Sequence, residues 1–133
     1  MRRFLSVFAG LVVAVSVLMG HESLAHAISP ALNAGDVALD GSGQGVFALS
    51  TPAKLTVVAG WFLGAFAGAL TALGVSRWPP AAWIVGALVL AGGIANIAAI
   101  PHPLWMQVAA VLLPVLAVVA ALRIERRRGV VAA

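Results

Sequence analysis

The sequence predicts an all-α integral membrane protein, an antiparallel bundle of four transmembrane helices with both termini in the cytoplasm. The first observation is composition: 62% of the 133 residues are hydrophobic and only 9% are charged, whereas about a quarter of a soluble domain is charged. The second is the succession of four apolar stretches, each near the length of about 20 residues that a bilayer core requires. The third is the one-sided distribution of the basic residues.

The four expected spans fill almost the whole chain, as a single membrane domain over residues 1–133. We expect them at about 4–27, 53–75, 81–100 and 104–122, with one long outer loop at 28–52. Each should be helical, because unpaired backbone polar groups are too costly in hydrocarbon. The short turns at 76–80 and 101–103 contain prolines, and turns this short force neighbouring helices to run in opposite directions.

The basic residues predict the orientation of these spans. Lys54 is on the outer side of the pattern, and the other seven of the eight basic residues are on the inner side: Arg2, Arg3, Arg77, Arg123, Arg126, Arg127 and Arg128. By the positive-inside rule, both termini are cytoplasmic. The net charge of +4 then serves orientation and contact with anionic lipid, so we expect no nucleic-acid partner.

The first span has an alternative interpretation as a secretory signal. Two arginines, an apolar run from Phe4 to Met19 and the tripeptide Ala25-His26-Ala27 follow one another, which is the order of a signal with an A-x-A cleavage site. The apolar run is at or above the usual signal length, which favours retention as a span. Cleavage would leave three spans, and this alternative stays open.

Three glycines in the second span, Gly60, Gly64 and Gly68, are spaced by four residues. This spacing places them on one helix face, where another backbone can approach closely. The pattern predicts packing against the first or third span, with a seam between copies of the chain as the alternative.

Polar residues are expected to gather at the outer end of the bundle. Glu22 and His26 are four residues apart and can pair on one helix face, while His21 points elsewhere. Asn96 and His102 belong to the same outer end. Three interpretations remain: a polar cap at the interface, a proton or cation relay, and a metal or haem site using Glu22, His26 and His102.

Other catalytic patterns are absent from the sequence. The chain has no cysteine, which excludes disulfides, thiolate metal sites and cysteine nucleophiles. It contains no Ser/His/Asp set, P-loop or H-E-x-x-H motif, so nothing indicates an enzyme, and no cofactor is strongly indicated. Pro114 should kink the fourth span, because it removes one backbone hydrogen bond.

With Glu22-x-x-x-His26-x-x-x-Pro30 and the turn Ile100-Pro101-His102-Pro103-Leu104-Trp105, the chain resembles a group of small, largely uncharacterised bacterial membrane proteins with four spans. The resemblance implies that Glu22, His26, Asn96 and His102 belong together, in a multi-pass protein of the bacterial inner membrane. It supplies no activity. Small multidrug transporters also have four short spans, but they carry a carboxylate deep in the first span, where this chain has none.

These observations favour an interaction or accessory component of a membrane complex. Its expected partners are the lipid bilayer and other membrane subunits, or a second copy through the Gly60/Gly64/Gly68 face. The alternative is a small proton-linked transporter, or a metal- or haem-binding membrane protein, that uses the outer Glu/His cluster. An enclosed polar pathway would favour transport, whereas a solid Gly/Ala core would favour the accessory role.

Overall fold

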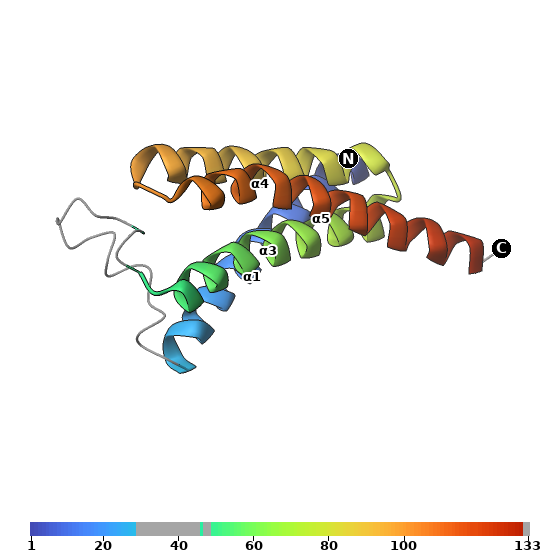
Figure 1. Ribbon diagram of the computed structural model, residues 1–133. Helices are drawn as coiled ribbons and strands as arrows, with labels where there is room; N and C mark the ends of the chain where they lie inside the picture. Colours follow the sequence, from blue (N-terminus) through green and yellow to red (C-terminus); the bar gives the residue numbers. More distant parts are fainter. Residues whose placement is uncertain (29–45, 47–48, 132–133) are drawn as a thin grey trace.

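The computed structural model describes residues 1–28, 46 and 49–131, and these form four helices and no strand. The helices are α1 (Arg2–Ile28), α3 (Thr51–Ser76), α4 (Pro79–Ala99) and α5 (Leu104–Val131). Each contains a segment long and apolar enough to cross a membrane. Figure 1 shows α4 and α5 side by side, with α1 and α3 crossing them at an angle. The predicted all-helical architecture with four candidate spans is thereby confirmed.

The helix bounds differ most from the prediction at the C-terminal end. The fourth span was expected to end at Leu122, but α5 continues to Val131. Its last turns contain arginines, which are good helix formers, so the helix continues beyond its apolar part. At the start of α3, the Ser50 hydroxyl accepts a hydrogen bond from the Ala53 N–H at 3.4 Å. Nearly all of the predicted outer loop at 28–52 lies outside the described residues.

The bundle has two distinct ends. At the arginine end, α1 begins, Arg77 and Trp78 join α3 to α4, and α5 ends; this is the right-hand side of Figure 1. At the loop end, α1 ends, α3 begins, and residues 100–103 join α4 to α5.

The arginine end is closed by contacts between helix termini. The Arg2 Nε donates a hydrogen bond to the Val75 carbonyl at 2.8 Å, and the Arg3 guanidinium lies 5.1 Å from the centre of the Trp78 ring. Arg77 ends α3 in the left-handed region, at φ 50°, and its N–H donates to the Leu73 carbonyl. Positive charge beside the exposed carbonyls of a helix C-terminus is stabilising.

The core beside this end consists mainly of small side chains. One buried cluster joins α3, α4 and α5 through Ala69, Leu73, Ala82, Val118 and Ala121. A second joins α1, α3 and α4 through Ala14, Ala72, Ala81 and Val85. Small residues let backbones approach, and close packing replaces the hydrophobic drive that lipid does not supply.

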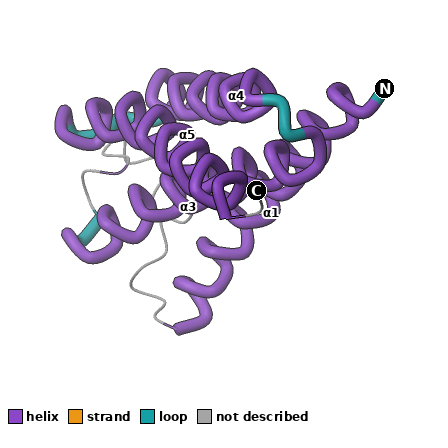
Figure 2. The backbone as a smooth tube through the Cα atoms, turned by 90° about the vertical axis from the view of Figure 1, so that its right-hand side faces the viewer, coloured by secondary structure: helices purple, strands orange, loops and turns teal. Residues whose placement is uncertain are grey.

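Toward the loop end the two helix pairs spread apart. In Figures 1 and 2 the last turns of α1 and the first turns of α3 diverge from the α4–α5 pair. A third buried cluster still holds α3 to α5 here, through Val46, Leu49, Ala53 and Met106. The separation therefore lies mainly between α1 and α4.

Candidate functional site

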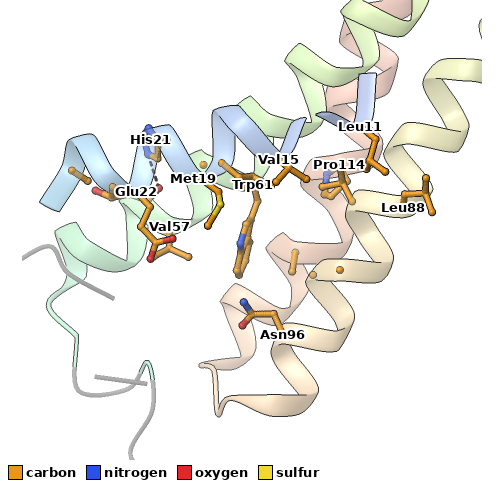
Figure 3. Close-up of a pocket in the computed structure, with 18 residues that line it drawn as sticks. Leu11, Val15, Met19, His21, Glu22, Val57, Trp61, Leu88, Asn96 and Pro114 are labelled. Carbon is orange, nitrogen blue, oxygen red and sulfur yellow. Dashed lines mark hydrogen bonds between the residues drawn. The ribbon is translucent and has the colours of Figure 1, made fainter. Parts of the chain in front are cut away.

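A cavity of about 370 Å³ lies between the helix pairs, and all four helices contribute to its lining. We call it the cleft; Figure 3 shows its walls. Its volume is at the lower end of the range for small-molecule sites, about 300–1,000 Å³. No single helix forms it, so it depends on how the bundle is assembled.

The cleft is apolar in its depth and polar toward the loop end. Leu11 and Val15 of α1 face Leu88 of α4 and Pro114 of α5 across the deep part (Figure 3). Closer to the loop end the lining changes to polar and aromatic side chains: His21, Glu22, Thr56, Trp61 and Asn96. This change from apolar to polar lining is typical of a site that binds an amphiphilic molecule.

Glu22 and Asn96 stand on opposite walls of this polar part. Glu22 comes from α1 and Asn96 from α4, with Trp61 of α3 between them in the close-up (Figure 3). Both side chains are exposed. Within the described part of the chain, the Glu22 carboxylate makes no hydrogen bond or ion pair. The structure thus brings these two predicted residues to one cavity.

His102 lies apart from the lining. Its side chain is only 4% exposed, and its Nδ1–H donates to the Ile100 carbonyl at 2.6 Å. The Gln107 side-chain amide donates to the His102 carbonyl at 2.8 Å, and the Trp61 ring lies 6.0 Å away, centre to centre. These contacts fix the turn between α4 and α5, so His102 acts here as a structural clasp.

The fourth predicted residue, His26, has its backbone in α1, but its side chain lies outside the described residues. Its pairing with Glu22 therefore stays a prediction. Among the described side chains, no three His, Asp or Glu residues are close enough to hold one metal ion. The metal or haem site expected from the sequence includes His26, so it stays a prediction.

His21 belongs to the cleft, although we expected it to point away from the other polar residues. Its Nε2–H donates to the Thr56 carbonyl at 3.0 Å. A Cβ on Gly60 would lie 3.0 Å from the His21 ring, so the ring can cover α3 because residue 60 is glycine. The sequence could have predicted this position. Gly10, Ala14 and His21 are spaced so that they lie on one face of α1.

The glycine stripe faces α1 throughout. Added Cβ atoms would meet Leu18 and the Ala14 carbonyl at Gly64, and the Gly10 carbonyl oxygen, at 2.6 Å, at Gly68. A Cβ on Gly10 would in turn lie 2.7 Å from the Gly68 carbonyl oxygen. The face considered for self-association is therefore occupied by α1 of the same chain, and a second copy would need another surface.

Pro114 interrupts the backbone hydrogen bonds of α5 beside the cleft. Proline has no N–H, so the carbonyl of Ala110, four residues earlier, lacks its helical donor. Both residues line the cleft, and the Ala110 oxygen would be 3.8 Å from a Cβ on Gly93 of α4. This carbonyl therefore packs against Gly93 of α4, and Ala110 is only 1% exposed.

No protein-family model matches the sequence, and no curated protein or solved structure is significantly similar to it.

Proposed function

We propose that this protein is a four-span accessory component of the bacterial inner membrane that works by binding and does not conduct ions. The observation that supports this most directly is the contact between Gly10 and Gly68, beyond the deep end of the cleft. Here the backbones of α1 and α3 touch, and Val85 of α4 covers both glycines. A polar route through the bundle would have to separate this seam.

The proposed arrangement is an antiparallel bundle with both termini cytoplasmic and the cleft on the outer side. The pairing of α1 with α3 supports it: Gly10 meets Gly68, Ala14 meets Gly64 and His21 meets Gly60, so one helix rises as the other descends. The arginine end carries Arg2, Arg3 and Arg77. The positive-inside rule assigns that end to the cytoplasm.

The alternative function is proton-linked transport. The cleft favours it in one respect, because Glu22 is an ionisable group in a cavity. Purified protein in liposomes with an imposed pH gradient and a trapped pH-sensitive dye separates the two functions. The accessory role predicts proton flux equal to that of empty liposomes. Flux above that level that is lost in Glu22→Gln would overturn the proposal in favour of transport.

The accessory role also predicts a stable neighbour. A photo-crosslinking residue placed at the exposed Leu112 of α5 should yield one discrete crosslinked product in native membranes. The same residue at the buried Ala69 is the matched control and should give none between chains. A chain that crosslinks only to lipid from every exposed face would contradict an accessory role.

A further inference from the structure

The one acidic side chain that lines the cleft among the described residues is the carboxylate of Glu22. This carboxylate has no described partner. Trp61 adds an aromatic ring, which attracts cations. Among the described residues that line the cleft there is no Lys or Arg. An occupant that complements this lining carries positive charge and N–H donors.

The apolar part of the cleft opens sideways between α1 and α4. Val15 and Met19 on α1 are 48% and 65% exposed, and Leu88 on α4 is 45% exposed, yet all three line the cavity. In a bilayer these side chains would meet lipid tails. An apolar chain can therefore enter from the membrane while its head stays beside Glu22.

We propose that the cleft binds a cationic amphiphile, with its ammonium head between Glu22, Trp61 and Asn96 and its apolar chain along Val15 and Leu88. This deepens the proposed function and rests on it for the position in the membrane. The same head chemistry has two sources, an amine-headed membrane lipid and a free long-chain amine. Both satisfy the carboxylate by a charge-assisted hydrogen bond.

The test compares two probes that share one tail, dodecylammonium and dodecanol. The protein is placed in phosphatidylcholine nanodiscs, with the other three tryptophans (Trp78, Trp83 and Trp105) changed to Phe so that emission reports on Trp61. We expect dodecylammonium to bind about two- to five-fold more tightly than dodecanol, because a carboxylate–ammonium contact at an exposed side chain is worth roughly that factor. Equal affinities for the two probes would overturn the proposal.

Two pairs of variants assign the effect to the cleft. Glu22→Gln should remove the preference for the ammonium, whereas Glu125→Gln, the same change near the end of α5, should keep it. Gly92→Leu should weaken both probes, because residue 92 lines the cleft and a Cβ there has open space. Gly74→Leu, equally open but outside the cleft, should weaken neither. Equal effects within either pair would also overturn the proposal.

Nanodiscs that contain phosphatidylethanolamine distinguish the two sources. Weaker apparent binding of dodecylammonium there would identify the lipid head as the competing occupant. Unchanged binding would identify a free amine. The proton-flux measurement is independent of these titrations, so a failure of ligand binding can be told apart from a failure of the accessory role.

Discussion

Single residues decide how closely α1 and α3 approach, and Gly68 is the most constrained of them. A Cβ at this position would lie 2.6 Å from the Gly10 carbonyl oxygen and 2.7 Å from the Ala14 Cβ. Neither neighbour can rotate away, since one is backbone and the other is attached directly to it. Gly74, two turns further along α3, has nothing within 4 Å of its Cβ position.

We therefore predict opposite outcomes for the same substitution at two glycines of α3. Gly68→Ala should lower the unfolding free energy by about 1–3 kcal/mol, the usual cost of overpacking. Gly74→Ala should raise it or leave it unchanged, because alanine is up to about 1 kcal/mol better than glycine in a helix. Thermal unfolding in one detergent measures both. A Gly68→Ala variant as stable as Gly74→Ala would contradict the close contact between α1 and α3 at Gly68.

For single residues, the sequence predicts the packing of the α3 glycines better than it predicts which polar residues line the cleft. Four-residue spacing is a property of one helix, so Gly60, Gly64 and Gly68 could be placed on one face without knowledge of the partner. The polar residues depend on how different helices meet. Glu22 and Asn96 do share a cavity, but His102 turns to the Ile100 carbonyl, and His21 joins the lining because Gly60 leaves space for its ring.

Among the elements, α1 matters most, because residues 1–27 of the chain have the alternative interpretation of a cleavable signal. In the structure α1 supplies one side of the seam and one wall of the cleft. A signal needs only an apolar run, whereas this helix places Gly10 and Ala14 against specific residues of α3. The fit supports retention.

We predict that protein purified from the membrane keeps residues 1–27, as intact-mass spectrometry would show. Gly10→Leu supplies the structural control: it should weaken the bundle in detergent, because a Cβ at position 10 meets the Gly68 carbonyl oxygen at 2.7 Å. A mature chain that begins at Ile28 would show instead that the helix is a signal, and the cleft would then lose a wall.

Hydropathy alone predicts that the four helices exist. For this reason the predicted spans and the observed helices begin and end at nearly the same residues in most cases. Hydropathy does not predict the length of α5. An apolar stretch indicates where a helix would leave the membrane, but it does not indicate where the helix ends. Arg123 to Arg128 therefore continue a helix whose membrane-crossing part was expected to end at Leu122.

For the whole molecule, the two ends of the bundle contrast: the helix termini contact one another at the arginine end, whereas the polar part of the cleft lies toward the loop end. This contrast depends on the angle between the α1–α3 and α4–α5 pairs (Figure 1), which no pattern in the sequence encodes directly. The same angle leaves Met19 of α1 and Leu88 of α4 exposed in the walls of the cleft, where the proposed amphiphile would enter.

The measurement that tests this account most directly is the labelling of single cysteines with a membrane-impermeant maleimide, in a chain that has no native cysteine. Ser23→Cys on α1, Asn96→Cys on α4 and Gly129→Cys on α5 all replace exposed residues. We predict that the first two react in intact cells and that Gly129→Cys reacts only after permeabilisation. Labelling of Gly129→Cys in intact cells, or of Ser23→Cys without Asn96→Cys, would contradict a four-span bundle whose cleft opens on the outer side.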